Sequence, residues 1–316
     1  MISKHKQRKN NLNLLLCTDN LVITMAEVLD KKKIRKVFRD VQKHLAIAQL
    51  IRRFSTNKDD IRKKALNEAD LSNCQNVLEL GCAFGAFTEA LKDKLHPEAK
   101  ITGIDIIPEY KPFFLEACRR AGYSGHFSSS GIDRIKRYPA RSFDLIICSY
   151  ALYFFPDMIP EISRILKTNG LFITITHSHR DMHEIIGIVK KILKQNNLID
   201  DKQSLPIELI FEQFSAENGK KLLDPFFGRI SAIDFKNELV FQPQEVGSFI
   251  DYFQFKKSLF LMGTGARYKT IIHQLMMELQ DLAMKENLVT MCKDDKIFIC
   301  SQPLEHSTVG VGGFPE

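Results

Sequence analysis

The chain has 316 residues, of which 44% are hydrophobic and 26% charged, as in an ordinary soluble globular protein with one large domain and appended segments. Its longest apolar run, residues 143–155, is too short to cross a bilayer, so the sequence predicts no transmembrane segment. The net charge of +7 is uneven, because residues 1–64 hold 17 Lys and Arg against 6 Asp and Glu while the remainder is slightly acidic.

The basic amino-terminal region is predicted to contain an extension and then helices. Residues 1–30 join a basic stretch to a short apolar run without a signal-peptide cleavage site, and we expect a disordered extension there. Residues 31–72 are predicted to be helical: 31–54 place apolar residues on one stripe, and Asp60 can cap a second helix. The charged face is either an ordinary solvated face or a surface for phosphate or an anionic membrane.

Strands and helices alternate between residues 73 and 178. The predicted strands lie at 76–81, 100–106, 125–130, 142–150 and 171–177, and the predicted helices at 84–95, 108–122 and 158–167. Apolar strands separated by amphipathic helices are typical of a mostly parallel sheet with helices on both faces. The sequence therefore predicts an α/β fold with this segment as its core.

The alternation breaks after residue 178. Helical stretches at 183–195 and 205–214 predict that residues 179–228 form a helical cap or lid inserted into the fold. Residues 229–304 are expected to complete the core sheet, with strands at 230–241 and 295–303 and two helices between them. We expect residues 305–316 to be a disordered tail.

The seven cysteines occur singly, at positions 17, 74, 82, 118, 148, 292 and 300. They form no CxxC pair and no cluster with histidine at metal-ligand spacing. Isolated cysteines in apolar surroundings are typical of reduced cytoplasmic proteins, so we expect a cytoplasmic location with neither disulfides nor a metal site.

The stretch NVLELGCAFGAFTEAL, residues 76–91, predicts a strand that enters a helix through a glycine turn. A dinucleotide site would need glycines at 81, 83 and 86, and positions 83 and 86 are alanines. Glu79, Gly81, Ala83 and Gly85 match three of the four positions of an acid followed by spaced glycines. In this respect the chain resembles the class I S-adenosylmethionine (SAM)-dependent methyltransferases, in particular their type 11 small-molecule group.

The resemblance continues in order over residues 76–176. Asp105 lies 20 residues after Gly85, where the family has a carboxylate that accepts both ribose hydroxyls. SFDLIICSYALYFFPD and EISRILKTNGLFIT resemble the fourth strand, fifth helix and fifth strand of the family. The resemblance implies a Rossmann-like, doubly wound, seven-stranded, mostly parallel sheet with SAM as the cofactor.

The same resemblance assigns residues to the cofactor site: Glu79, Gly81, Cys82, Ala83, Gly85, Asp105, Ile106, Ser130 and Ser149. Ala83 departs from the glycine of the family, and its methyl group is expected to weaken binding without abolishing it. Ser130 takes the place of an aspartate that holds the adenine amino group, and Asp133 is the alternative for that role.

Three side chains are candidates for catalysis. Tyr150 and Tyr153, in the loop after the strand at 142–150, could orient the acceptor or contact the cationic methyl group, or could merely pack. His177 follows the strand at 171–177, at the sheet edge where open α/β sheets bind ligands, and could act as a general base. His179 is an equal candidate, His183 a weaker one, and all three histidines could instead be structural.

The sequence thus predicts a cytoplasmic SAM-dependent methyltransferase with a small organic acceptor. The acceptor could be lipid-like or bound to an acidic carrier protein, which the basic amino-terminal helix would suit. SYALYF replaces the NPPY-like tetrapeptide of DNA and protein-glutamine enzymes, which disfavours those substrates. The alternatives are an RNA methyltransferase that uses residues 31–64 as a phosphate-binding arm and a SAM-binding module without turnover.

Overall fold

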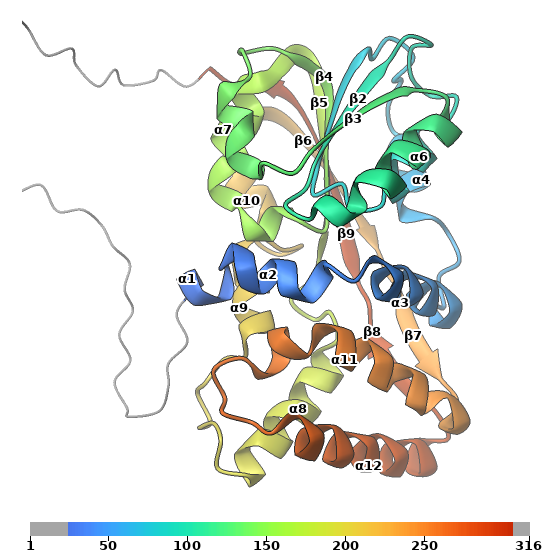
Figure 1. Ribbon diagram of the computed structural model, residues 1–316, viewed down its shortest axis with the longest axis vertical. Coiled ribbons are helices and arrows are strands. Elements are labelled where there is room, and N and C mark those ends of the chain that lie inside the picture. Colours follow the sequence, from blue (N-terminus) through green and yellow to red (C-terminus); the bar gives the residue numbers. More distant parts are fainter. Residues whose placement is uncertain (1–24, 306–316) are drawn as a thin grey trace, which may run out of the picture.

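The computed structural model describes residues 25–305 (Figure 1). Residues 1–24 and 306–316, which carry most of the predicted extension and tail, lie outside the described residues. Met25–Val28 form a short helix, α1, and the side chain of Val28 is 0% exposed. The prediction of a disordered extension is therefore wrong for its last residues, because Val28 joins the apolar core.

The order of elements follows the predicted alternation. The helices after α1 are α2 (Lys31–Phe38), α3 (Val41–Phe54), α4 (Ile61–Leu66), α5 (Ala86–Ala90), α6 (Lys111–Ala121), α7 (Ile159–Ile165), α8 (His183–Gln195), α9 (Pro206–Gln213), α10 (Gly219–Leu223), α11 (Val246–Leu261) and α12 (Tyr268–Glu286). The strands are β1 (Asn76–Leu80), β2 (Lys100–Ile104), β3 (Ser124–Ser128), β4 (Phe143–Ser149), β5 (Leu166–His177), β6 (Phe227–Phe235), β7 (Glu238–Phe241), β8 (Val289–Cys292) and β9 (Asp295–Pro303). Short 3-10 turns connect several of them, among them η1 (Pro108–Tyr110), η2 (Ile132–Arg137) and η3 (Leu152–Phe154).

Seven strands form one sheet in the order β3-β2-β1-β4-β5-β9-β6. Strand β9 runs antiparallel to both of its neighbours, β5 and β6, and the other pairings in this sheet are parallel. The strand order reverses between β1 and β4, so the carboxyl ends of these strands flank the crevice where open α/β sheets bind ligands. The predicted doubly wound, mostly parallel seven-stranded fold is confirmed.

Successive side chains of a strand point to opposite faces of the sheet, and here they are apolar on both faces. Val77 and Leu145 pack in the cluster covered by α5 and α6, whereas Leu78 and Ile146 pack in the cluster covered by α7 and α10. The wholly apolar strands of the sequence therefore reflect burial on two sides.

A second lobe lies at the lower end of the sheet in Figure 1 and contains α8, α11 and α12. Strands β7 and β8 form a separate antiparallel pair there. Residues 229–304 were expected to complete the core sheet, but only β6 and β9 join it and the segment between them belongs to the lobe. The predicted strand at 230–241 divides at Asn237, whose side-chain oxygen accepts from the Asn57 N–H at 3.0 Å and whose own N–H donates to Asp294 at 3.1 Å.

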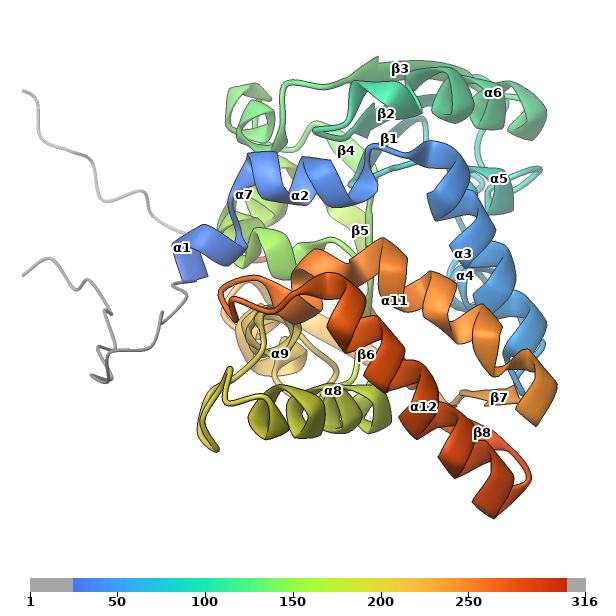
Figure 2. The ribbon, with the colours of Figure 1, turned by 60° about the horizontal axis from the view of Figure 1, so that its bottom comes forward.

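The predicted helix at 31–54 is two helices, α2 and α3. The carboxylate of Asp40 accepts a hydrogen bond from the Lys43 N–H at 3.2 Å and thereby caps α3, which ends the continuous helix at this point. Both helices contact α11, and Figure 2 shows α11 between them and α12. The amino-terminal helices thus lie across the junction of the sheet and the lobe.

Within residues 25–305, no helix combines the length and the apolarity that a membrane span requires.

Strand β1 leaves the sheet through a turn that needs glycine for two reasons. Gly81 has a φ of 66° and Gly85 a φ of 81°, in the left-handed region that other residues adopt at a cost. A Cβ atom at Gly81 would also lie 2.5 Å from the Cβ of Ala151, and one at Gly85 would lie 2.5 Å from the Cβ of Ala117. The turn therefore packs its backbone directly against the neighbouring loop and against α6.

Replacing Gly81 by alanine should destabilise the protein by roughly 2–4 kcal/mol, as the sum of left-handed backbone strain and overpacking. Gly187→Ala is the matched control: this glycine lies in α8 with nothing within 4 Å of an added Cβ atom, and the substitution should stabilise by about 0.4–1 kcal/mol. Urea unfolding of both variants measures the difference. Equal effects at the two positions would contradict the tight turn.

Candidate active site

The turn after β1 is tied to the end of β2 by Asp105. The Ala83 N–H donates to Oδ2 of Asp105 at 3.0 Å, and the Ile107 N–H donates to Oδ1 at 3.0 Å. The Gly81 N–H also donates to the carbonyl of Ile104 at 2.8 Å. These bonds place the predicted glycine turn and the predicted acid side by side at the carboxyl edge of two adjacent strands.

The Asp105 carboxylate is only partly exposed. Burial raises its pKa to about 6, although the N–H groups of Ile107 and Ala83 act in the opposite direction. Each carboxylate oxygen accepts one backbone hydrogen bond and keeps a second lone pair. The group can therefore accept hydrogen bonds from two hydroxyls of a ligand at the turn.

Ala83 adopts the conformation that its position demands. Its φ of 43° lies in the left-handed region, which an alanine occupies at a cost of roughly 1–2 kcal/mol. Cys82 contributes only backbone to the turn, because its side chain is 3% exposed and its Sγ would lie 2.7 Å from a Cβ added at Gly103. The turn thus presents mainly backbone to a ligand.

Glu79 points into the protein. Its side chain is 3% exposed and accepts a hydrogen bond from the hydroxyl of Thr88 in α5. Burial raises the pKa of Glu79 to about 7, and the hydrogen bond from Thr88 opposes this shift. The bond joins the end of β1 to the helix that follows the turn, so the side chain of Glu79 positions α5.

The end of β3 lies beside Asp105. The Asp105 N–H donates to the carbonyl of Ser128 at 3.1 Å, and the hydroxyl of Ser128 lies 2.8 Å from that of Ser130. Asp133 instead pairs on the surface with Lys31 at 3.0 Å. Of the two residues considered for the third strand, Ser130 is the one linked to Asp105, through Ser128. Ile106, directly after Asp105, is half-buried.

The loop after β4 carries the two predicted tyrosines. It follows Ser149, which pairs with Ile175 of β5. Tyr150 has a φ of 55°, and its hydroxyl donates to Oδ2 of Asp295 at 2.6 Å. The rings of Tyr150 and Tyr153 are nearly parallel to the imidazole of His177, with centroids 4.6 Å and 6.0 Å away. The tyrosines therefore hold His177 in place.

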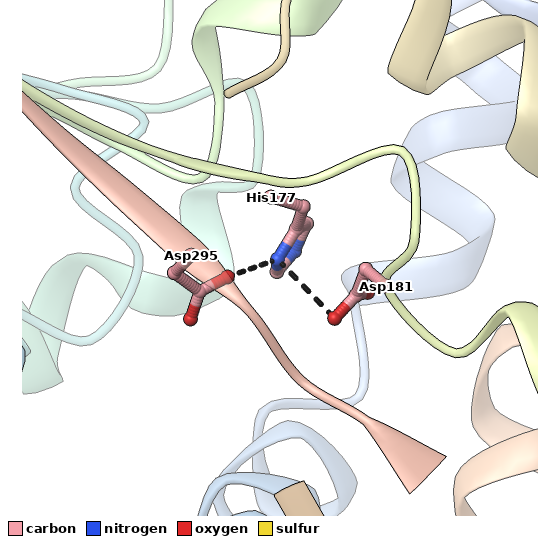
Figure 3. Close-up of side chains that lie close together, drawn as sticks. All are labelled: His177, Asp181 and Asp295. Atoms are coloured by element: carbon pink, nitrogen blue, oxygen red, sulfur yellow. Dashed lines mark hydrogen bonds and ion pairs between the residues drawn. The ribbon is translucent and has the colours of Figure 1, made fainter. Parts of the chain in front are cut away.

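His177, at the end of β5, belongs to a buried polar cluster with Asp181, Lys293 and Asp295. Figure 3 shows the imidazole between the carboxylates of Asp181 and Asp295. Its Nδ1 lies 2.7 Å from Oδ1 of Asp295 and 3.7 Å from Oδ1 of Asp181. The cluster joins the loop after β5 to the first residue of β9.

The ammonium of Lys293 occupies the centre of this cluster. Its Nζ lies 2.9 Å from Oδ1 of Asp181, 3.2 Å from Oδ1 of Asp295 and 3.0 Å from Nδ1 of His177. One histidine and two aspartates this close together are also a candidate metal-binding group. The positive charge of Lys293 already balances one of the two carboxylates. A metal ion at this position would have to displace the ammonium.

The protonation states of the cluster follow from burial and charge. Burial lowers the pKa of His177, and the charge of Lys293 adds to this effect against the opposing influence of the carboxylates. Burial alone would raise the pKa of Asp295, but Lys293 and the hydrogen bonds from His177 and Tyr150 hold it below its ordinary value. The cluster therefore combines an ionised carboxylate with a neutral imidazole at neutral pH.

The other two candidate histidines lie on the surface. His179 is exposed and its Nε2 lies 2.8 Å from the hydroxyl of Ser215, whereas His183 is exposed near the carbonyl of Arg180. Neither joins the buried cluster. Only His177 shares the carboxyl edge of the sheet with the two tyrosines.

Sequence reasoning missed Asp181, Lys293 and Asp295. The only local signal is the run KDDK at 293–296, which places charges at the start of an apolar strand. Asp181 follows His177 by four residues but lies in a loop, so no helical spacing pointed to it. Their association depends on the pairing of β5 with β9, which brings His177 opposite Asp295.

Aromatic side chains from the amino-terminal helices and the lobe cover the turn. The ring of His44 in α3 packs 5.2 Å from Phe84 and 5.4 Å from Phe255 of α11, measured between centroids. Its Nδ1 lies 2.6 Å from the hydroxyl of Tyr110, which donates to the carbonyl of Phe38 at 2.9 Å. Burial, together with the charge of Lys256, lowers the pKa of His44 to about 4. A neutral imidazole thus bridges the cover and the turn.

Known proteins match the core of the chain. An uncharacterized methyltransferase of Schizosaccharomyces pombe is 24% identical over 141 residues, which are 42% of this chain and 52% of that protein. Aklanonic acid methyltransferase DauC of a Streptomyces species is 33% identical over 93 residues, 28% of this chain and 41% of that protein. The chain thus spans about half or less of the length of these relatives.

Among solved structures, a SAM-dependent methyltransferase from Aquifex aeolicus is 17% identical, with a TM-score of 0.38, and the match covers 54% of this chain and 82% of that one. The family model described as a methyltransferase domain matches residues 71–229, from the loop before β1 to the start of β6. The match takes in half of the chain, including the glycine turn, Asp105 and His177. The chain therefore belongs to the methyltransferase domain family.

Proposed function

We propose that this protein transfers a methyl group from SAM to a small organic acceptor. The observation that carries the proposal is the half-buried Asp105 carboxylate, held against the glycine turn by the Ala83 N–H at 3.0 Å. Family membership supports the reaction type. DauC is named for an acid that it methylates, which makes a small molecule a reasonable class of acceptor here.

The residues at the turn fit SAM. Gly81 and Ala83 present backbone without bulky side chains, and the free lone pairs of Asp105 can accept the two ribose hydroxyls. Ile106 directly follows Asp105, and Ser130 is linked to Asp105 through Ser128, so both would lie on the side of the adenine. When bound, the cofactor supplies an electrophilic methyl group on a sulfonium. The protein then has to position the acceptor, exclude water and remove a proton.

His177 is proposed as the general base. An Nδ1–H that donates to Asp295 at 2.7 Å would leave Nε2 without a proton and free to accept one from the acceptor. Asp295 would hold this tautomer against Lys293, whose Nζ lies 3.0 Å from the same Nδ1 but also has carboxylate oxygens at 2.9 Å and 3.2 Å to donate to. Tyr150 and Tyr153 would keep the imidazole ring in place.

For an RNA acceptor, the positive charge of the amino-terminal helices is the relevant feature, and part of that charge is neutralised within the protein. Three of their basic side chains form ion pairs within the protein: Lys31 with Asp133, Arg35 with Glu109, and Arg53 with Glu245. These pairs reduce the positive charge that a phosphate backbone would meet. A SAM-binding module without turnover is the other alternative. Methyl transfer by the unmodified protein that is lost in the His177 variant below would exclude it.

Asp105→Ala should weaken SAM binding by about 2–3 kcal/mol, or roughly 30- to 150-fold, because a charge-assisted hydrogen-bonding group is removed. Isothermal titration calorimetry with SAM measures the change, and circular dichroism checks the fold. Asp133→Ala removes a surface carboxylate and should leave the affinity unchanged. Equal affinity of Asp105→Ala and the unmodified protein would show that the ribose assignment is wrong.

His177→Gln should lower methyl transfer into a small-molecule extract by about 100-fold or more, the range of general base catalysis, while SAM affinity stays unchanged. Transfer of tritiated methyl from SAM measures the rate, and His179→Gln is the control that should remain active. Because the pKa of His177 lies below its ordinary value of 6.5, the active neutral form should persist below pH 6.5 and the rate should fall only at lower pH. Full activity of His177→Gln would exclude the base.

A further inference from the structure

Two buried polar groups near the cluster of His177 have no hydrogen-bond partner among the described residues. The hydroxyl of Tyr252, on α11, belongs to a side chain that is 0% exposed. The Oδ2 atom of Asp181 is also unpartnered, and its side chain is 0% exposed. Leaving such a group unpaired costs about 1–3 kcal/mol, so each is expected to bind something that the protein itself does not supply.

Lys256, one turn further along α11, is the third unpaired group. Its ammonium lies 4.9 Å from the ring centroid of Tyr252, and within residues 25–305 it makes no ion pair and no hydrogen bond. Burial lowers the pKa of Lys256 to about 8, against the influence of Asp181 and Asp295 and with that of Lys293. A cation of this kind is costly to bury unless an anion accompanies it.

Asp181, Tyr252 and Lys256 lie within electrostatic reach of one another, and the ammonium of Lys256 lies over the ring of Tyr252. After burial, the charge of Asp181 is the main cause that raises the pKa of both Tyr153 and Tyr252. The charge of Lys256 reaches His44, which packs against Phe84 of the glycine turn. Helix α11 therefore faces both the polar cluster and the cover of the turn, which places the unpaired groups beside the site proposed for the cofactor.

Charge balance alone does not explain Lys256. Lys293 already lies within 3.2 Å of both Asp181 and Asp295, whereas Lys256 reaches neither within ion-pairing distance. The next residue, Lys257, shows what an ordinary lysine of this helix does: its side chain is exposed and lies 4.5 Å from the ring of Tyr268. Lys256, by contrast, is half-buried, and its ammonium lies over the ring of Tyr252, which is fully buried.

We propose that Lys256 and Tyr252 bind an anionic oxygen of the acceptor, and that the acceptor is a small organic acid. Asp181 would accept a hydrogen bond from a hydroxyl or amine of the same molecule through its free Oδ2 atom. This inference rests on the proposed methyl transfer, since it names the substrate class for that site.

The test compares matched probes that differ in charge: benzoate with benzamide, and hexanoate with hexanamide. Calorimetry measures their binding to the full chain in the presence of S-adenosylhomocysteine, the demethylated product, which prevents turnover. We expect the carboxylate of each pair to bind about tenfold more tightly or better. Lys256→Met should abolish this preference, and Tyr252→Phe, which keeps the ring and its packing, should reduce it several-fold.

Lys257→Met is the matched control, because it removes a lysine of the same helix that also lies over a tyrosine ring, and the preference should survive. The organic-acid inference would be overturned if S-adenosylhomocysteine binds but the carboxylates bind no more tightly than the amides. It would also be overturned if Lys256→Met and Lys257→Met lose the carboxylate preference equally. Either result would leave the proposed function intact. Failure of both SAM and its product to bind would defeat the proposed function itself, and this inference with it.

Discussion

The architecture of the site depends on the ion pairs of Lys293 with Asp181 and Asp295. Two buried carboxylates this close together would repel each other, and the cation between them makes their burial tolerable. Asp295 can then stay ionised, accept from Tyr150 at 2.6 Å and lie 2.7 Å from Nδ1 of His177. The loop after β4, the end of β5 and the start of β9 are thereby held together at one edge of the sheet.

The two halves of the site are built on different principles. The half proposed for the cofactor uses backbone at the glycine turn and one carboxylate, Asp105, all within two adjacent parallel strands. The half proposed for the acceptor uses side chains from segments far apart in the chain, including Tyr252 and Lys256 of α11. The sheet provides a rigid edge common to many reactions, and the lobe supplies the groups that would distinguish one acceptor from another.

The amino-terminal helices close the space between these halves. His44 of α3 packs against Phe84 of the turn and Phe255 of α11, so this one side chain contacts both the glycine turn and the lobe. The break between α2 and α3 at Asp40 sets the direction in which α3 crosses this junction. Three basic residues of these helices, Lys31, Arg35 and Arg53, pair with acidic groups of the body, which gives their charge a structural role.

The sequence by itself determined the order of the core strands and helices, the glycine turn and the position of Asp105, because apolar periodicity and left-handed turn residues act over a few neighbouring positions. It did not separate β7 from β6, since that break depends on bonds from Asn237 to Asn57 and Asp294, which are distant in the chain. Only the tertiary structure decided that His177, and not His179, is buried, and that Asp181, Lys293 and Asp295 surround it. Strand pairing between β5 and β9 creates that neighbourhood, and no local pattern of residues records which strands will pair.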